Sequence, residues 1–305
     1  MNVNKIGKKT INIANKLVNN TVLIIMLALM SLAGYALWDS NQLHQGADKS
    51  KYEIYKPRSE DEGQSFADLQ AINDEVIGWL TVYGTNIDYP VTQGEDNMKY
   101  VNTSAEGQYS LSGAIFLDHG NNKAFSDFNN ILYGHHMAKK VMFGEIEEFA
   151  NKEMFENNKY GNLYANNIDY GIEFFAFIHV DAYDGSVFRV NIKEENQEAY
   201  LENIIDKAIH YREIGISVTD RIILLSTCSS NSTNGRDILI GRITDETYDD
   251  PTIIQSDDNS SRYTNTKDNI SIKIPLAAML LIIVFIMLIL VRMYDVMNKK
   301  RGQAI

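Results

Sequence analysis

The only cysteine of the chain, Cys228, is the first candidate for chemistry. It ends the apolar run of residues 221–228, and a loop-like stretch separates it from Arg236, which begins the next apolar run. Two strands joined in this way form a hairpin, so Cys228 and Arg236 are predicted to face each other at its open end. A guanidinium favours the thiolate and donates hydrogen bonds to a developing oxyanion. The alternatives are a buried apolar cysteine and an arginine that is only a surface charge.

A general acid or base is also needed, and His135 and His136 have the best placement for it. They follow the apolar run of residues 130–134, at the predicted end of a strand, where catalytic groups are common. Adjacent side chains of an extended chain point to opposite sides, so only one of the two is expected to face Cys228. The residues alone do not decide which one, and a purely structural role is the alternative for each. Other histidines lie in a polar stretch near the N-terminus (His44), in an apolar run (His179) and on the exposed side of a predicted helix (His210).

A metal centre is the competing chemical interpretation. Its ligands would be Asp118, His119, His135 and His136. No HExxH or CxxC pattern supports this, and adjacent histidines rarely bind one ion together, so no metal is predicted. The sequence also lacks the Walker A, GxGxxG and GxSxG patterns, which leaves nucleotide binding and the α/β-hydrolase fold without support.

The elements that must position these residues lie within residues 65–245, the predicted catalytic domain. Short apolar runs bounded by Gly, Asn and Asp predict strands: VIGWLTV, IDYPV, GAIFLD, NILYG, YGNLYA, GIEFFAFIHV, VFRVNI, RIILLSTC and RDILIGRI. A hairpin turn is predicted at residues 83–86, and helices at 65–73, from 141 onward, and at 194–212. Many strands without alternating helices favour a β-barrel decorated with helices.

Two uncharged apolar runs, residues 22–38 and 274–291, bracket this domain and predict transmembrane helices. The first run is predicted to be an uncleaved anchor, with a cleaved signal peptide as the alternative. Basic residues flank the outer side of each run, which places both termini in the cytoplasm and residues 39–273 outside. The remaining segments are predicted as basic cytoplasmic tails (1–21 and 292–305), a stalk (39–64) and a polar linker (246–273).

The net charge of −12 is concentrated between the two apolar runs. Nucleic-acid binding requires clustered Lys and Arg facing phosphate, so an acidic domain of this kind argues against a nucleic-acid partner. A single cysteine also excludes an internal disulfide.

These residues together resemble the class B sortases. Residues 225–228 (LSTC), followed by Arg236, resemble the TLxTC…R signature of sortases, and residues 133–137 (YGHHM) resemble the class B catalytic-histidine segment. Further matches are GWL (78–80), IDYPV (87–91), Asp96-Asn97 with Tyr100, and GAIFLD (113–118). There are two departures: Leu224 stands where the signature has its first Thr, and a C-terminal membrane helix is more typical of pilus-assembling sortases.

The resemblance implies a mostly β fold, a closed eight-stranded β-barrel with an N-terminal helix and a long helix before the cysteine strand, plus two transmembrane helices. It implies that Cys228 is the nucleophile, His135 the general acid/base and Arg236 the group that stabilises substrate and oxyanion. Ser226 and Thr227 are expected to shape the substrate groove. No cofactor is expected.

The function implied is that of a cysteine transpeptidase at the membrane of a Gram-positive bacterium. Such an enzyme cleaves a sorting motif in exported proteins and transfers the acyl group to an amine of cell-wall peptidoglycan precursor or of a pilin subunit. Two other functions stay open: a thiol peptidase that hydrolyses without transfer, and a non-catalytic membrane scaffold on a sortase-like fold.

Overall fold

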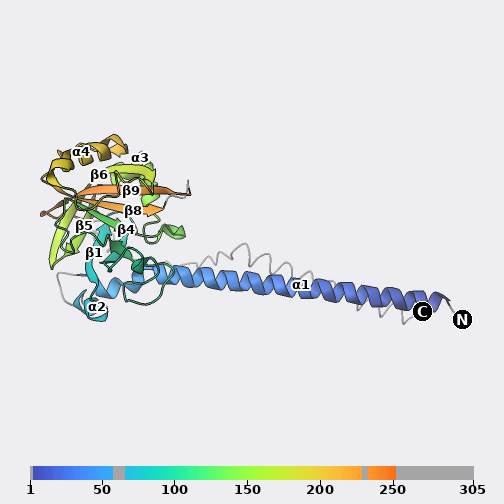
Figure 1. Ribbon diagram of the computed structural model, residues 1–305. Coiled ribbons are helices and arrows are strands. Elements are labelled where there is room, and N and C mark those ends of the chain that lie inside the picture. The colour runs from blue at the N-terminus through green and yellow to red at the C-terminus, as the bar shows by residue number, and fades with distance from the viewer. Residues whose placement is uncertain (1–2, 58–65, 229–232, 252–305) are drawn as a thin grey trace, which may run out of the picture. The chain divides into compact units, whose positions relative to one another are not determined.

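The computed structural model describes residues 3–57, 66–228 and 233–251 (Figure 1). Helix α1 (Val3–Ala47) contains one stretch, Thr10–Leu37, that is long and apolar enough to cross a membrane. It includes most of the first predicted membrane run. The second predicted run, residues 274–291, lies outside the described residues.

The remainder of the described chain is built on a β-barrel. Eight strands follow one another in the order β5-β1-β2-β3-β4-β8-β9-β6, and a β5–β6 pairing closes the barrel. The predicted closed eight-stranded barrel is therefore confirmed. The strands are β1 (Val76–Val82), β2 (Asp88–Thr92), β3 (Ile115–Leu117), β4 (Asn129–Tyr133), β5 (Tyr160–Ala165), β6 (Ile168–Asp181), β8 (Arg221–Cys228) and β9 (Gly235–Thr244).

Short helices decorate this barrel. Helix α2 (Phe66–Ile72) precedes β1, as predicted, and α4 (Glu194–Asp206) lies over the side of the barrel formed by β6 and β9 (Figure 1). The connection between β4 and β5 contains η5 (Ile146–Ala150) and α3 (Lys152–Asn157). Other 3-10 turns are η1 (Lys49–Lys51), η2 (Glu53–Tyr55), η3 (Lys99–Val101) and η4 (Ala138–Lys140).

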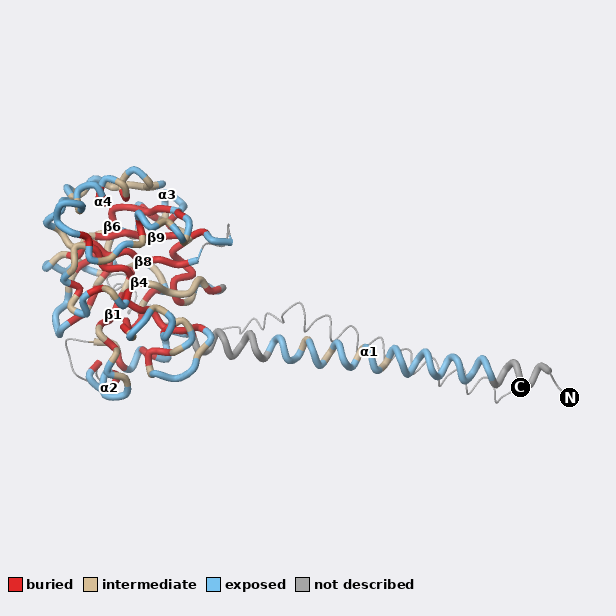
Figure 2. Tube along the Cα trace, in the orientation of Figure 1, coloured by how far each residue is buried: buried red, intermediate tan, exposed pale blue. Residues whose placement is uncertain are grey.

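Alternation along β8 and β9 divides the apolar side chains between two cores, and most of these strands is buried (Figure 2). Ile223, Leu225 and Leu239 belong to the core inside the barrel, whereas Ile222 and Leu224 belong to a second core on the outer face. Side chains of α4 cover that outer core, namely Tyr200, Leu201 and Ile204. Because alternate residues share a face, Ser226 and Cys228 belong to the outer face, just beyond the part that α4 covers.

The helix predicted for residues 194–212 is wrong at its C-terminal end. It ends at Asp206, and Ala208–Tyr211 form strand β7 instead. Strand β5 pairs with β6 only as far as Glu173, so the edge beyond is open, and β7 pairs there with Ala176–Ile178. An open strand edge offers backbone partners that outweigh the helical periodicity of the apolar residues.

Two further predictions need correction. Residues 141–144 do not begin a helix, because Met142 has a φ of 52° and a Cβ at Gly144 would lie 2.1 Å from the carbonyl oxygen of Met137. The run VFRVNI forms no strand but a loop after β6, with Val187 and Ile192 buried in the outer core. Its apolar residues reflect burial rather than pairing. The turn predicted at residues 83–86 is confirmed: Val82 N–H donates to Ile87 O, and Gly84 has a φ of 77°.

Candidate active site

Cys228 and Arg236 are direct partners at the end of the β8–β9 ladder. The two strands pair in unbroken register from Arg221↔Ile243 to Cys228↔Arg236. Opposite residues of an antiparallel pair have Cβ atoms about 4.5–5.5 Å apart. The cysteine is exposed and the arginine is half-buried, with one N–H of its guanidinium donated to Gly235 O at 3.0 Å. The predicted hairpin thus places thiol and guanidinium side by side.

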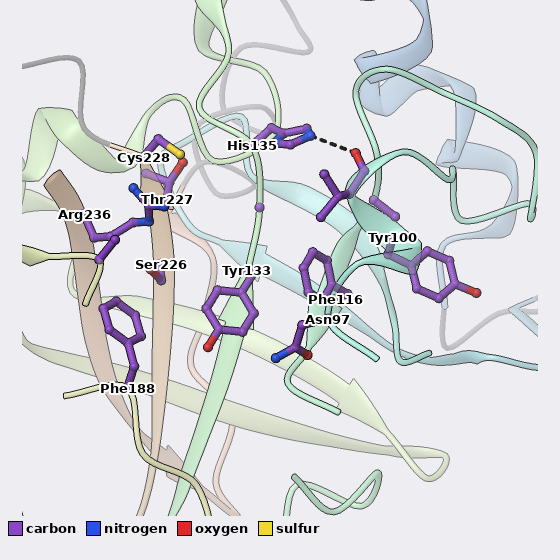
Figure 3. Close-up of a pocket in the computed structure, with 14 residues that line it drawn as sticks. Asn97, Tyr100, Phe116, Tyr133, His135, Phe188, Ser226, Thr227, Cys228 and Arg236 are labelled. Carbon is purple, nitrogen blue, oxygen red and sulfur yellow. Dashed lines mark hydrogen bonds between the residues drawn. The ribbon is translucent and has the colours of Figure 1, made fainter. Parts of the chain in front are cut away.

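The sheet also determines where His135 lies. Strand β4 runs parallel to β8 with Tyr133 opposite Ser226, and Gly134 N–H continues the ladder by donating to Ser226 O at 3.2 Å. His135 follows Tyr133 by two residues, just as Cys228 follows Ser226. The histidine therefore leaves the sheet on the strand beside the cysteine, and in Figure 3 the sulfur of Cys228 points toward the side on which His135 lies.

One nitrogen of the His135 ring is already engaged. Its Nε2 lies 2.8 Å from the carbonyl oxygen of Val101 (Figure 3). A carbonyl only accepts, so Nε2 is assigned as the protonated nitrogen. Nδ1 is then the nitrogen at which this ring gains or loses a proton. The fixed contact orients the imidazole without consuming its acid–base capacity.

His136 points away from this region. Its Nε2 lies 3.1 Å from Glu147 Oε1, on the opposite side of the chain from His135. The expectation that only one of the two histidines faces Cys228 is confirmed, and the geometry selects His135. His119 lies beside Asp118 at 3.5 Å, so the four potential metal ligands do not converge. Within the described ranges, no three His, Cys, Asp or Glu side chains come together to hold a metal.

A cavity of about 410 Å³ brings the candidate residues together. Its lining includes all five residues singled out from the sequence: His135, Ser226, Thr227, Cys228 and Arg236. Ser226 and Thr227 are buried at the base of the β8 strand end. The other lining residues are Asn97, Tyr100, Val101, Ala114, Phe116, Tyr133, Gly134, Ala182 and Phe188.

Aromatic rings and one buried carboxylate form the wall opposite the cysteine. Tyr133 contacts Phe116 and Phe188, with ring centroids 5.4 and 6.4 Å away. Its hydroxyl donates to Asp118 Oδ2 at 3.0 Å, and Asn97 Nδ2 donates to the same oxygen at 2.8 Å. Burial and then the Asp118 carboxylate raise the pKa of Tyr133 far above its usual range. The hydroxyl therefore remains a neutral donor at physiological pH.

Two parts of this site have no signal in the sequence. Val101 contributes a backbone carbonyl, which any residue type supplies. Phe188 reaches the cavity from the loop after β6, which the sequence pattern assigned to a strand. An aromatic residue next to a turn was the only available hint.

Comparison with known proteins supports one family. No protein-family model matches the chain. It is 30% identical over 179 residues to sortase B of Listeria monocytogenes, covering 58% of this chain and 72% of that relative. It is also similar to sortase B from the type II pilus of Streptococcus pneumoniae, with 46% identity and a TM-score of 0.53 over 60% of this chain and 99% of that structure.

A third similar protein has been solved with bound molecules. The Staphylococcus aureus sortase B structures, one a substrate complex and one a complex with triglycine, are 26% identical to this chain with TM-scores of 0.55. They cover 69% of this chain and 96% and 97% of those structures. The barrel, the paired cysteine and arginine, and these similarities over nearly whole relatives lead to one assignment: this chain belongs to the class B sortases, a family of cysteine transpeptidases.

Proposed function

We propose that this chain is a sortase that cleaves a sorting motif in exported proteins and transfers the acyl group to an amine. The observation that carries the proposal is the single groove that receives Cys228 and Arg236 from one rung of the β8–β9 ladder and His135 from the adjacent strand. A nucleophile, a cation for the oxyanion and a proton carrier are the groups that acyl transfer requires.

In the first step, the Cys228 thiolate attacks the carbonyl carbon of the substrate peptide and a C–S bond forms. Arg236 donates hydrogen bonds to the resulting oxyanion, which its place beside the thiol favours. The C–N bond then breaks, and the leaving amine takes a proton from His135 Nδ1. A thioester on Cys228 remains.

In the second step, an amine attacks the thioester carbon and gives its proton to the His135 ring. The C–S bond breaks and the thiolate is restored, so no external cofactor enters the balance. Ser226 and Thr227, at the base of the cavity, contact the substrate in this proposal. The substrate is an extended sorting peptide, and the acceptor is a peptidoglycan-precursor or pilin amine.

The pilus relative favours a pilin amine over the wall precursor, since that pneumococcal protein is 46% identical whereas the Staphylococcus aureus enzyme is 26% identical. The chain is proposed to work at the outer face of the membrane, held by the span within Thr10–Leu37, with both termini in the cytoplasm. The basic tails, the stalk, the linker and the second membrane run complete the arrangement proposed from the sequence.

The test uses full-length protein in detergent with a set of sorting-type peptides and either a pilin lysine peptide or triglycine, followed by mass spectrometry. A transpeptidation product from the wild type, with a thioacyl adduct on Cys228 and neither in Cys228→Ala, supports the proposal. Hydrolysis without transfer at saturating amine indicates a thiol peptidase. Absence of any adduct across the peptide set favours the scaffold, and unchanged product from Cys228→Ala removes the nucleophile assignment.

A further inference from the structure

The loop that carries His135 has an unfavourable backbone. Between β4 and η5, the non-glycine residues Lys139, Lys140 and Met142 have φ angles of 62°, 59° and 52°. Residues held in this left-handed region are strained and persist only where surrounding contacts impose the conformation. Contacts that hold this loop are therefore needed to keep His135 in place.

Backbone contacts secure the returning half of the loop. Phe143 N–H donates to His135 O at 3.1 Å, and His136 pairs with Met142 as an isolated bridge. Met142 N–H donates to the hydroxyl of Tyr89, a buried residue of β2, at 3.1 Å. These contacts fix the backbone of residues 142 and 143 to the barrel. They leave the rotation of the His135–His136 segment to be fixed by side chains.

One side-chain contact acts directly on that segment. His136 Nε2 lies 3.1 Å from Glu147 Oε1 on η5, close enough for an ion pair although not aligned as a hydrogen bond. The two side chains are 20% and 32% exposed, so solvent screens the contact only in part. The neighbouring Lys140 pairs with Glu148 at 2.7 Å but is half-exposed and lies at the loop tip.

We propose that His136 and Glu147 are positioning residues for His135. Adjacent side chains of an extended segment project to opposite sides, so the His136 ring holds the back of the chain while His135 faces the groove. Releasing His136 from Glu147 lets the segment rotate, and the His135 ring then leaves the carbonyl of Val101 and the side of Cys228. This inference rests on the role of His135 in the function proposed above.

The experiment compares kcat and KM of full-length protein for the wild type, His136→Ala, His136→Gln, Glu147→Ala and the double variant His136→Ala/Glu147→Ala. Misplacement of a catalytic group by about 1 Å costs up to roughly 100-fold, so each Ala variant is expected to lower kcat about 10-fold or more with KM within about 2-fold. The double variant is expected to be no slower than the slower single variant, since the two residues act through one contact. His136→Gln, which keeps a polar group near Glu147, is expected to recover part of the loss.

Two controls separate positioning from folding. Glu153→Ala removes an exposed carboxylate of α3, the next helix along, and is expected to leave kcat unchanged. The alkylation rate of Cys228 by iodoacetamide is expected to be the same in all variants, because its strand does not depend on the loop. Thermal melts give the folded fraction at the assay temperature.

The outcomes are distinct. A wild-type kcat that both Ala variants retain within about 2-fold overturns the inference while leaving the proposed function intact. So does a loss that merely follows the folded fraction, or losses that add in the double variant. A wild type without transpeptidation is a failure of the proposed function itself, which the Cys228→Ala comparison reports separately.

Discussion

The two sides of the groove are held in different ways. Cys228 and Arg236 end a ladder whose backbone pairing runs without interruption along the whole of β8. His135 instead begins a loop that contains three non-glycine residues with positive φ and is fixed by Tyr89 and Glu147. One half of the site is thus positioned by main-chain hydrogen bonds and the other half mostly by side chains.

This difference predicts how each half responds to mutation. A ladder of backbone bonds tolerates exchange of nearby side chains, because the bonds do not depend on residue type. A strained loop depends on particular contacts, so removing one of them shifts the group that it carries. Substitutions near the histidine are therefore expected to reduce kcat more than substitutions near the cysteine, unless they replace a reacting group.

The largest effect is expected for a reacting group on the cysteine side. Arg236→Lys keeps the charge but loses the planar pair of donors, and kcat is expected to fall about 100- to 1,000-fold. The melting temperature is expected to stay within a few degrees, because the half-buried side chain only donates to Gly235 O within the protein. Steady-state kinetics and a thermal melt measure both quantities. Activity within a few-fold of the wild type would remove Arg236 from oxyanion stabilisation.

Gly134→Ala tests the packing under the histidine. A Cβ at this position would lie 2.6 Å from the ring of the buried Phe143, so either the ring or the chain must shift. Overpacking of this kind destabilises by roughly 1–3 kcal/mol, and we expect kcat to fall with it. The matched control is Gly185→Ala, where nothing lies within 4 Å and no change is expected. Equal denaturation midpoints for the two variants would contradict the prediction.

Tyr89→Phe removes the side chain that joins the loop to β2. It leaves Met142 N–H without its acceptor and Ala47 O without its donor, which costs about 1–3 kcal/mol. Burial raises the pKa of Tyr89 to about 12, so its stabilising contribution is complete below the unfolded pKa near 10 and is lost as pH rises toward 12. Wild-type stability is thus expected to fall between these pH values, with a shallower fall in Tyr89→Phe. Urea denaturation at several alkaline pH values tests this.

The smallest effect is expected beside the cysteine. Asp237 follows Arg236 on β9, and its buried carboxylate lies 2.7 Å from Nδ1 of His179 on β6. Asp237→Asn retains an acceptor for that nitrogen, and the Cys228↔Arg236 pairing does not depend on the side chain. We expect kcat within about 3-fold of the wild type and a stability loss of about 1 kcal/mol, the usual value for one hydrogen bond. A loss of kcat larger than that of His136→Ala would reverse the comparison between the two sides.

The sequence predicted the barrel and the cysteine–arginine pair because both follow from local patterns. Apolar runs separated by turns define the strands, and the loop between Cys228 and Arg236 places them opposite each other. It did not predict β7, because Ala208 and Ile209 fit the face of a helix as well as the open edge of β6. It could not choose between His135 and His136 without the family resemblance, since the choice depends on the β4–β8 register. The Val101 carbonyl has no signal at all, because main-chain groups carry no residue identity.

The single thiol at the strand end has a consequence for oxidative damage. The chain has one cysteine, and it is exposed. When a peroxide converts such a thiolate to sulfenic acid, no second cysteine of the same chain can condense with it to form a protective disulfide. Further oxidation to the sulfinic acid is irreversible for most proteins. Recovery of an oxidised molecule therefore depends on a reductant from outside the chain, such as a small thiol or a redox protein.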